Sequence, residues 1–329
     1  MSNKQSYEPP ITITPAILRL ATDISVKADR LAVRGESALD LRLRRVSQVR
    51  SIKGTLAIEG NALDEVTITA ILEGKRVVAP LREIQEVRNA IAAYDIFEKW
   101  TPHDEVDLLK AHGILMAGLI DDAGRYRRSG VGVIAGSQVL HMAPPAKRVP
   151  LLMGDLLNWL ARTELHPLVA GSVFHYEFEF IHPFSDGNGR LGRLWQTLIL
   201  CRWNPRFASV PVENIVHLHQ EEYYNALIEA TKAGDSAPFV EFMLTMILEA
   251  LKSVVSPQVA PQVSPQVKRL LETLTGEMSG REIMEVLDLT DRKSFRHRYL
   301  APALDAGLIE MTIPDKPNSH LQKYRLIGA

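Results

Sequence analysis

The chain has 329 residues, of which 46% are hydrophobic and 23% are charged, and its formal net charge is −1. The length predicts two or three domains, and the composition is typical of soluble globular proteins. The small net charge excludes a bulk electrostatic field that would attract nucleic acid or a membrane surface. Cys201 is the one cysteine, so an internal disulfide is excluded, and its apolar helical surroundings favour a buried thiol.

The chain carries no pattern typical of targeting or membrane insertion. Its first ten residues are polar and contain two prolines, so they lack the apolar core of a signal peptide. No apolar run is long enough to span a bilayer. We therefore expect a cytoplasmic protein without a membrane partner.

Residues 1–118 are predicted to be helical. Thr14-Pro15 is typical of a helix start, and apolar residues at helical spacing predict a helix to about Val33. A second helix is expected over about 39–60, and Asp64 suits the N-cap of a third. Two more helices are expected over 81–100 and 104–119. Their apolar positions at three and four spacing are Ile84, Val87, Ile91, Tyr94, Val106, Leu109, Ile114 and Leu115.

Residues 131–134 and 139–142 predict the one strand pair of this part of the chain. They flank Ala135-Gly-Ser-Gln138, a hairpin signal, and Pro144-Pro145 ends the pair. An isolated hairpin in a helical protein is marginally stable and leaves open edges. Since an open edge can capture an extended peptide by adding a strand, a functional role is favoured.

The residues after the hairpin are predicted to form two helices, over 149–161 and 168–182. Residues 174–180 alternate as a strand would, but two helical faces fit the longer segment better. His175 on this helix is interpreted as structural. The helix leads into His182, the first residue of the most informative stretch of the chain.

This stretch reads His182-Pro-Phe-Ser-Asp-Gly-Asn-Gly-Arg-Leu-Gly-Arg193. Residues 187–190 form a glycine-rich loop that opens a helix, which is typical of a phosphate site. Arg190 and Arg193 share one helix face and suit a polyphosphate. Asp186 is placed to hold Mg²⁺, and His182 is suited to proton abstraction near neutral pH. Each piece alone is common in structural turns, but their combination within twelve residues is hard to explain by packing.

The stretch matches the Fic family motif H-P-F-x-[D/E]-G-N-G-R-x-x-R at every defined position, so the chain resembles Fic proteins. The resemblance implies a helical domain that binds ATP with Mg²⁺ and moves AMP onto a hydroxyl of a protein target. It implies that His182 is the general base and that Asp186 holds the metal. The residues implied to hold the ATP phosphates are Gly187, Asn188, Gly189, Arg190, Leu191, Gly192 and Arg193.

The end of the helix over 39–60 also matches a family pattern. Glu59 lies at the unfavourable, negative end of the helix dipole, and Gly60 suits a left-handed cap. Many Fic proteins carry an inhibitory helix with the pattern [S/T]-x-x-x-E-[G/N], which Thr55, Glu59 and Gly60 fit. The resemblance implies that Glu59 pairs with Arg193 and blocks productive seating of the ATP γ-phosphate. The alternative is a solvated glutamate at a helix end.

The resemblance also gives the hairpin and a later helix expected roles. The hairpin corresponds by position to the flap that docks the target segment in Fic proteins. After the motif helix, helices are expected over 212–233 and 237–254. On the first of these, Tyr224 is predicted to stack on adenine and Asn225 to bond its edge. Plain core packing of Tyr224 is the alternative.

The last part of the chain begins with a Pro-Gln-Val repeat over 256–267, which predicts an extended linker. Three helices are expected after it, over 268–275, 279–287 and 291–306. A hairpin of 308–313 with 321–326 completes a module that resembles a winged helix. Arg292, Arg296 and His297 are candidates for DNA contacts. Ten basic against nine acidic residues from Lys268 onward argue against a duplex-binding module, so a protein-interaction role is equally favoured.

We therefore predict a mainly α fold, a Fic-type helical domain with a small β-hairpin flap plus a C-terminal winged-helix domain. The expected divisions are 1–118, 119–255, 256–267 and 268–329. The predicted function is adenylyl transfer from ATP to a Ser, Thr or Tyr hydroxyl, autoinhibited by Glu59. The alternatives are a related transfer on the same fold (phosphorylation, another nucleotide moiety or removal of AMP) and a DNA-binding regulator that senses nucleotide. Self-modification and a homodimer stay open.

Overall fold

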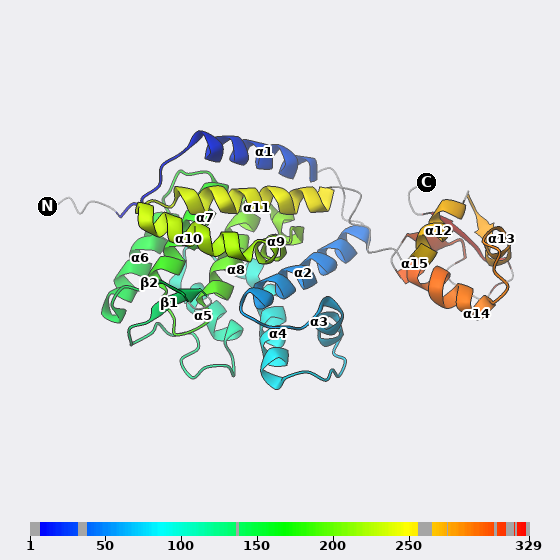
Figure 1. The fold of residues 1–329 in the computed structure, drawn as a ribbon, viewed down its shortest axis with the longest axis horizontal. Coiled ribbons are helices and arrows are strands. Elements are labelled where there is room, and N and C mark those ends of the chain that lie inside the picture. The colour runs from blue at the N-terminus through cyan, green and yellow to red at the C-terminus, as the bar shows by residue number, and fades with distance from the viewer. Residues whose placement is uncertain are drawn as a thin grey trace. The chain divides into compact units, whose positions relative to one another are not determined.

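The computed structural model describes residues 7–31, 38–135, 138–255, 265–274, 276–305, 308–313, 319 and 321–326. The chain divides into two compact units, Met1–Val255 and Ser256–Ala329, and each has its own apolar core (Figure 1). Most of the predicted linker, residues 256–264, lies outside the described residues. Among the described helices, none combines the length and the apolar character needed to cross a membrane.

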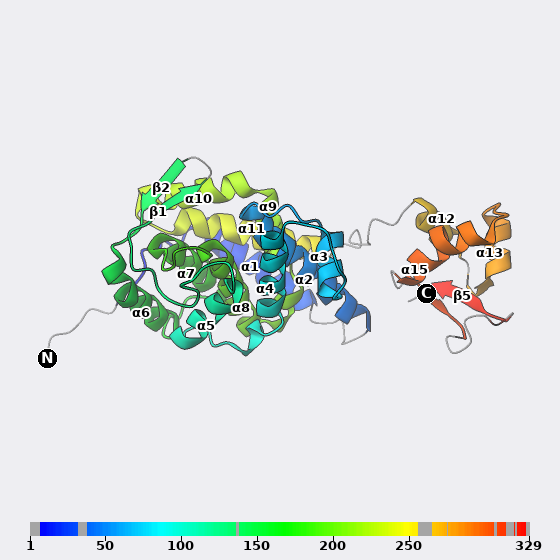
Figure 2. The same ribbon diagram turned by 90° about the horizontal axis from the view of Figure 1, so that it is seen from below.

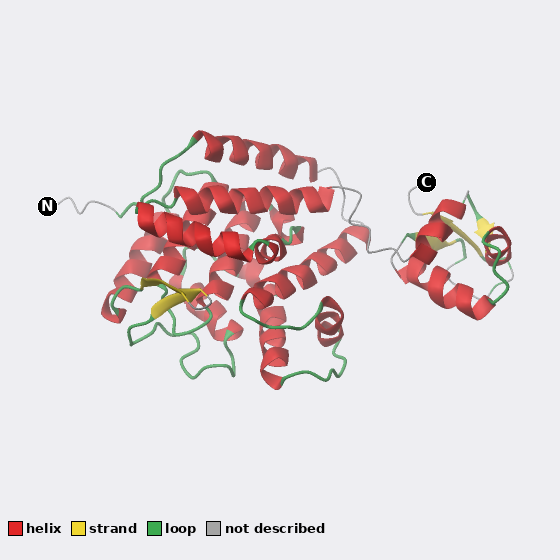
Figure 3. Ribbon diagram, in the orientation of Figure 1, coloured by secondary structure: helices red, strands yellow, loops and turns green. Residues whose placement is uncertain are grey.

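The first unit is built from α-helices, drawn in red in Figure 3, with one small hairpin drawn in yellow. The hairpin consists of β1 (Gly132–Ala135) and β2 (Gln138–Met142). Short 3-10 helices occur at Phe97–Lys99, Ala146–Arg148 and Pro205–Ser209. The α-helices are, in chain order, α1 (Pro15–Leu31), α2 (Ala38–Ile58), α3 (Glu65–Leu72), α4 (Leu81–Tyr94), α5 (Glu105–Leu115), α6 (Val149–Leu160), α7 (Pro167–Ile181), α8 (Asn188–Trp203), α9 (Val212–Leu218), α10 (Gln220–Ala233) and α11 (Ala237–Val255).

Helices α7 and α8 form the centre of this unit. Thirteen of the fifteen residues of α7 are buried, because α6, α8, α11 and α1 all pack against it. This burial on every side explains why residues 174–180 alternate like a strand although they form the predicted helix. Helix α1 lies along α11 on the outside of the unit (Figure 1), so in the view from below it lies behind the other helices (Figure 2).

Several helix starts are those that the sequence predicts. The Thr14 hydroxyl accepts from the Ile17 N–H at 3.1 Å, and Asp64 accepts from the Thr67 N–H at 2.8 Å. These side chains satisfy N–H groups that lack intrahelical partners, which is worth on the order of 1 kcal/mol each. Helix α2 ends at Ile58, and Gly60 follows with the left-handed φ of 89° expected of a cap.

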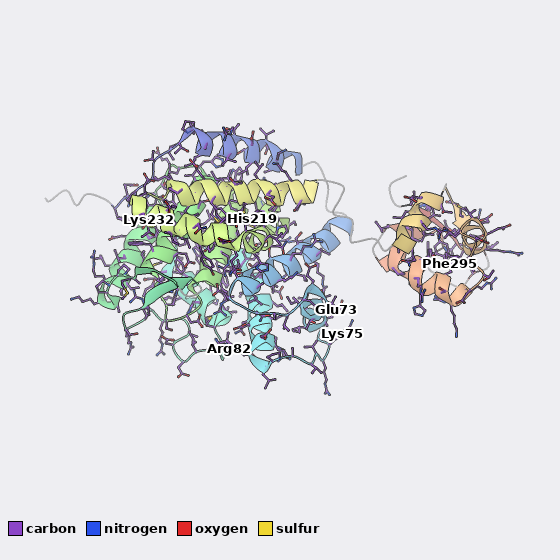
Figure 4. All side chains as sticks on the ribbon, in the orientation of Figure 1. Glu73, Lys75, Arg82, His219, Lys232 and Phe295 are labelled. Atoms are coloured by element: carbon purple, nitrogen blue, oxygen red, sulfur yellow. The ribbon has the colours of Figure 1, made fainter. Side chains whose placement is uncertain are left out.

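Three predictions about these helices are wrong. The helix expected over 81–100 ends at Tyr94, and a separate 3-10 helix follows at Phe97–Lys99. In α5 the exposed fraction of Val106 is 72%, and the face toward the core carries Leu108, Ala111, His112 and Leu115 instead. The helix expected over 212–233 is interrupted at His219, which is labelled in Figure 4. The interruption lets α9 pack on α2 and α10 pack on α11 and β2.

Strands β1 and β2 pair in the predicted antiparallel hairpin, and the turn residues 136 and 137 lie outside the described residues. The register pairs Val133 with His141 and Ile134 with Val139. Leu140 therefore has no partner across the pair and is the extra residue of a β-bulge.

The second unit combines three helical segments with a small antiparallel sheet. The helices are α12 (Pro265–Thr273), α13 (Gly280–Val286) and α14 (Arg292–Phe295), which continues through a π-helical turn into α15 (Ala301–Asp305). Strands β3 (Met278–Ser279), β4 (Ile309–Met311) and β5 (Lys323–Leu326) pair in the order β3-β5-β4.

Two details of this unit correct the sequence prediction. Strand β3 was not expected, because two residues are too short for a periodic pattern. Helix α12 begins at Pro265, inside the region predicted as linker, because proline suits the first helical position and Val267 and Leu270 are buried. The predicted cap at Ser279 is present, and its side chain and that of Glu282 form a reciprocal capping box. The assignment of a winged helix stays a prediction.

Candidate active site

The motif residues lie where the two central helices meet. Helix α7 ends at Ile181, and His182 adopts the left-handed conformation with φ 50° and ψ 62°. Helix α8 begins at Asn188 after Gly187, whose φ is 82°. A Cβ atom at Gly187 would lie 2.5 Å from the Met116 sulfur, so glycine is required for both backbone and packing reasons.

Asn188 closes the loop between these helices. Its side-chain oxygen accepts from the Phe184 N–H at 2.9 Å, and its nitrogen donates to the Phe184 carbonyl at 3.0 Å. Leu191 is fully buried in the core, and a Cβ atom at Gly192 would lie 3.1 Å from both Glu179 and His175. Any contact of these three residues with a phosphate therefore runs through the main chain of α8.

Thr55, Glu59 and Arg193 meet as the sequence predicts. The Arg193 Nε donates to the Thr55 hydroxyl at 2.9 Å, and Nη2 donates to the Thr55 carbonyl at 3.0 Å and to Glu59 Oε1 at 2.7 Å. Burial alone would lower the pKa of Arg193, but the attraction of Glu59 and its neighbours raises this pKa overall. The end of α2 is thus tied to the second motif arginine by a charge-assisted pair, in which Arg193 is buried and the Glu59 side chain is 30% exposed.

Gly189 makes room for this pair. A Cβ atom there would lie 2.5 Å from Glu59 Oε1 and 2.9 Å from the Arg193 Nη1. The Glu59 carboxylate therefore lies over the first turn of α8, at the positive end of the helix dipole. A phosphate bound to this turn would take the same position.

Asp186 and Arg190 lie beside this turn. Asp186 Oδ1 accepts from the Gly187 N–H at 2.6 Å and from Arg190 Nη2 at 3.0 Å, while Oδ2 lies 3.6 Å from Arg82 Nη2. Arg82 is labelled on α4 in Figure 4. The buried Arg190 also has Nη1 3.8 Å from the Glu86 carboxylate. Both motif arginines are therefore paired with carboxylates.

The residues present fit a magnesium ion held mainly by phosphates. The Asp186 side chain is 39% exposed and lies at the start of α8. The described residues contain no cluster of three or more His, Cys, Asp or Glu side chains that could hold a metal by themselves. Mg²⁺ commonly takes one or two carboxylates, phosphate oxygens and several waters, so one carboxylate at this place suffices.

His182 is the one motif residue suited to accept a proton. Its side chain is 20% exposed, and its Nδ1 lies 3.8 Å from the Glu179 carboxylate. Glu179 is buried, and burial raises the pKa of this carboxyl to about 7. His175 lies on the other side of Glu179, where its ring contacts Gln196 and Tyr223, and burial lowers its pKa to about 3. His175 is thus neutral and structural, as the sequence predicts.

His112 of α5 contacts the motif loop through its ring and one ring nitrogen. Its ring stacks on Phe184 with centroids 3.7 Å apart and planes inclined by 9°. Its Nδ1 accepts from the Gly124 N–H at 2.8 Å, so Nε2 carries the proton and donates to the Asp186 carbonyl at 2.9 Å. Burial lowers the pKa of His112 to about 4, so the neutral ring is stable near pH 7.

Tyr224 and Asn225 on α10 differ in their exposure to solvent. The Tyr224 ring is half-buried beside Tyr223, and its hydroxyl is 3.4 Å from the Gln220 amide, which donates to the Ile58 carbonyl at 3.0 Å. Tyr224 therefore lies close to the end of α2. The Asn225 side chain is exposed.

The sequence did not point to Arg82, Glu86 or Arg127, all of which contact the motif. Arg82 and Glu86 have ordinary polar positions on an amphipathic helix, and Arg127 belongs to an irregular loop. No periodicity or motif distinguishes such residues from solvent-facing ones.

The fold and the site define a helical domain in which one loop and one helix start present a histidine, a carboxylate and paired arginines. Residues 102–200 match the model of the Fic/DOC family. Residues 265–327 match that of the "Filamentation induced by cAMP protein Fic-like, C-terminal domain".

A crystal structure of a Fic family protein from Desulfovibrio desulfuricans G20 is 51% identical, with a TM-score of 0.74, and the match covers 98% of this chain and 99% of that one. The chain belongs to the Fic family. A structure of Fic-1 from Caenorhabditis elegans is 24% identical with a TM-score of 0.62, over 73% of this chain and 72% of that one, which shows the shared fold.

Curated relatives match over part of their length. "Protein adenylyltransferase Fic" of Culex quinquefasciatus is 31% identical over 231 residues, which are 65% of this chain and 43% of the mosquito protein. "Protein adenylyltransferase fic-1" of Caenorhabditis elegans is 31% identical over 216 residues, 61% of this chain and 40% of the nematode protein. The chain thus spans less than half the length of these curated relatives.

Proposed function

We propose that this protein transfers AMP from ATP to a hydroxyl side chain of a protein target. The observation that carries the proposal is the convergence of His182, Asp186 and the first turn of α8 in one loop. A proton acceptor, a metal-holding carboxylate and a phosphate cradle are the parts that nucleotidyl transfer requires. The names of the curated relatives support the same activity.

In the proposed reaction, His182 accepts the proton of a target Ser, Thr or Tyr hydroxyl. The hydroxyl oxygen attacks the α-phosphorus of ATP, the bond from that phosphorus to the bridging oxygen breaks, and pyrophosphate leaves. The N–H groups of the first turn of α8 and the side chains of Arg190 and Arg193 hold the phosphates. Catalysis is mainly positioning and charge stabilisation.

Asp186 would hold Mg²⁺ in this proposal. The ion would neutralise charge on the phosphates, and Asp186 would exchange its contact with Arg190 for the metal. Arg190 would then turn to the phosphates, which are the better partner for its guanidinium once the carboxylate is occupied.

We further propose that Glu59 inhibits the transfer. While Glu59 holds Arg193 at 2.7 Å, its carboxylate lies above Gly189, in the space that a phosphate of ATP needs. ATP can bind only with its phosphates displaced, and displacement of about 1 Å from in-line geometry costs on the order of a hundredfold in rate. Tyr224 is proposed to contact the adenine, since it lies beside the end of α2.

The test of the transfer uses ATP labelled at the α-phosphate and mass spectrometry of the labelled chains. A mass increase by AMP on a hydroxyl residue is expected, and an increase by phosphate alone would refute the proposed reaction. His182→Ala should abolish labelling while the dissociation constant for ATP stays within a few-fold, because the phosphates are held elsewhere. Full activity of His182→Ala would exclude His182 as the base.

The test of inhibition compares two glutamates that end helices. Glu59→Gly should increase self-labelling by about a hundredfold, because it removes the carboxylate from the phosphate position. Glu73→Gly is the matched control, since Glu73 follows α3 and pairs with the exposed Lys75 at 2.6 Å; both are labelled in Figure 4. Equal labelling by the two variants would rule out inhibition through Glu59.

A further inference from the structure

Arg127 is a buried arginine outside the motif whose contacts join two parts of the active site. Only 2% of its surface is exposed, although it lies in the loop between α5 and β1. Its Nε donates to the His182 carbonyl at 2.7 Å, and its backbone N–H donates to the Pro183 carbonyl at 2.9 Å. Its Nη2 also lies 3.3 Å from the Ile181 carbonyl. These contacts hold the main chain on both sides of the proposed base.

The remaining donors of the same guanidinium bind the two ends of the hairpin. Nη1 donates to the Ser129 carbonyl at 2.8 Å, three residues before β1 begins. Nη2 donates to the Pro144 carbonyl at 2.6 Å, two residues after β2 ends. One rigid, planar group therefore fixes the distance between both ends of the hairpin and the residue that carries the imidazole.

The local main chain explains why a cation is placed there. The last carbonyls of α7 lack intrahelical partners, and Pro183 has no N–H to continue the helix. His182 is in the left-handed region, which is unfavourable for a residue with a Cβ atom. A guanidinium at the negative end of the α7 dipole stabilises these carbonyls and this conformation.

We propose that Arg127 is a positioning residue that couples the hairpin to His182. The inference rests on the proposed function, in which His182 accepts the proton of the target, and on the docking role of the hairpin that the resemblance to Fic proteins implies. A hydroxyl held by the hairpin reaches the imidazole only if the two parts keep a fixed relation. Arg127 supplies this relation, and these hydrogen bonds go to residues outside the phosphate cradle of α8.

The test uses the full chain with Arg127→Met, which keeps the aliphatic stem and removes every guanidinium contact. The matched control is Arg125→Met, which removes an exposed arginine of the same loop. Amide hydrogen exchange should become at least tenfold faster in residues 131–143 and also in residues 183–188, while α1 and α11 keep their protection. Faster exchange in only one of these segments, or equally throughout the unit, would overturn the proposal.

Activity gives a second readout in the Glu59→Gly background. Self-labelling by Arg127→Met should fall at least tenfold relative to Arg125→Met, while the calorimetric dissociation constant for ATP changes less than twofold. Parallel loss of labelling and ATP binding would mean a merely structural arginine. If Glu59→Gly itself transfers no AMP, the proposed function fails, and the exchange and ATP measurements still decide the role of Arg127.

Arg127→Lys keeps the test decisive if Arg127→Met does not fold. Lysine keeps the charge at the end of α7 but replaces a planar fork by a single ammonium, which cannot reach all four carbonyls. Arg127→Lys should therefore fold and bind ATP, while its self-labelling stays well below that of the Arg125→Met control. Full labelling by Arg127→Lys would show that charge alone is needed and would contradict the coupling.

Discussion

At the scale of single residues, the proposed function makes two anions compete for one position. Glu59 Oε1 lies 2.7 Å from Arg193 Nη2 and close to Gly189, and we propose that a phosphate of ATP takes the same place. The carboxylate is tethered to the protein, so it competes at a high effective concentration. A change that weakens the contact of Glu59 with Arg193 should therefore shift the equilibrium toward bound nucleotide.

The first residue-scale prediction concerns Thr55, which is buried and accepts from Arg193 Nε at 2.9 Å. Thr55→Val keeps the shape of the side chain and removes this one hydrogen bond, which is worth about 1.5–3 kcal/mol when one partner is charged. The Thr55 carbonyl and Glu59 still hold Arg193. Self-labelling should therefore rise about tenfold, to a level below that of Glu59→Gly. Labelling no higher than wild type would mean that Thr55 does not help to hold Arg193 in the inhibited state.

The second residue-scale prediction concerns pH and the buried His112. Its pKa is about 4 in the folded chain and about 6.5 when unfolded, so between these values only the unfolded chain binds the proton. The contribution to stability is complete above pH 6.5 and is lost as pH falls toward 4. His175, with its pKa near 3, acts in the same direction. Glu179 opposes both, because its raised pKa of about 7 makes stability fall as pH rises from about 4.5 to 7.

Urea unfolding at pH 6.0, 5.5 and 5.0 checks this prediction. The free energy of unfolding of His112→Gln should change less steeply with pH than that of the wild-type chain, by about one proton or ~1.4 kcal/mol per pH unit. Comparing slopes removes the effect of the lost ring stacking, which is the same at each pH. Identical slopes would mean that His112 titrates normally in the folded protein.

At the scale of secondary-structure elements, α2 is held by more than the contact of Glu59 with Arg193. Gly54 lies one turn before the end of α2, and a Cβ atom there would meet the Asn214 main chain of α9 at 2.5 Å. Ser51 donates to Glu213 at 2.7 Å, and Thr197 of α8 donates to the same buried carboxylate at 2.8 Å. The last turns of α2 are thus positioned against α8 and α9 by Ser51 and Gly54 as well as by the pair of Glu59 and Arg193.

Gly54→Ala tests this close packing. The added methyl group would contact backbone that cannot rotate away, so α2 must shift, at a cost of about 1–3 kcal/mol. The thermal midpoint should fall by several degrees. Gly154→Ala is the control, because a Cβ atom on α6 meets nothing within 4 Å. An unchanged midpoint for Gly54→Ala would contradict the observed approach of α2 to α9.

The second element-scale prediction concerns the hairpin, where the bulge provides one paired and one unpaired position to compare. Val133→Pro places a proline in a paired position of β1 and should impair self-labelling more than ATP binding, if the hairpin docks the target. Leu140→Pro is the matched comparison, because Leu140 is the unpaired residue of the bulge, where proline is better tolerated. Equal effects of the two variants, or equal loss of ATP binding and labelling, would mean that strand pairing in the hairpin is not what matters.

The elements and residues that the sequence predicted correctly are those whose signal is local. The motif loop, the caps at Thr14 and Asp64, and the Thr55–Glu59 spacing are all contained within a few residues. Arg127 could not be identified in this way, because its acceptors at Pro144 and His182 are 17 and 55 positions away. The interruption at His219 likewise depends on which helices α9 and α10 meet, and a single-helix pattern does not contain that information.

At the scale of the whole molecule, the site lies entirely in the first unit. The apolar core of this unit extends from Ile17 to Leu251, and that of the second unit extends from Val267 to Tyr324. In the second unit Arg292 and Arg296 line a cavity of about 430 Å³ together with Phe295 and Tyr324. Phe295 is labelled in Figure 4. Arginines beside an apolar cavity suit a protein partner as well as a nucleic acid, which agrees with the small net charge of this unit.

The whole-molecule prediction is that a chain ending at Val255 keeps the fold, the Glu59–Arg193 pair and the activity of the first unit. The reason is that the two cores share no residue, so removing one leaves the other packed. The thermal midpoint of the first unit and the gain of labelling from Glu59→Gly should match those of the full chain within error. If the truncated chain gains labelling without Glu59→Gly, the second unit takes part in the inhibition, and α2 alone does not account for it.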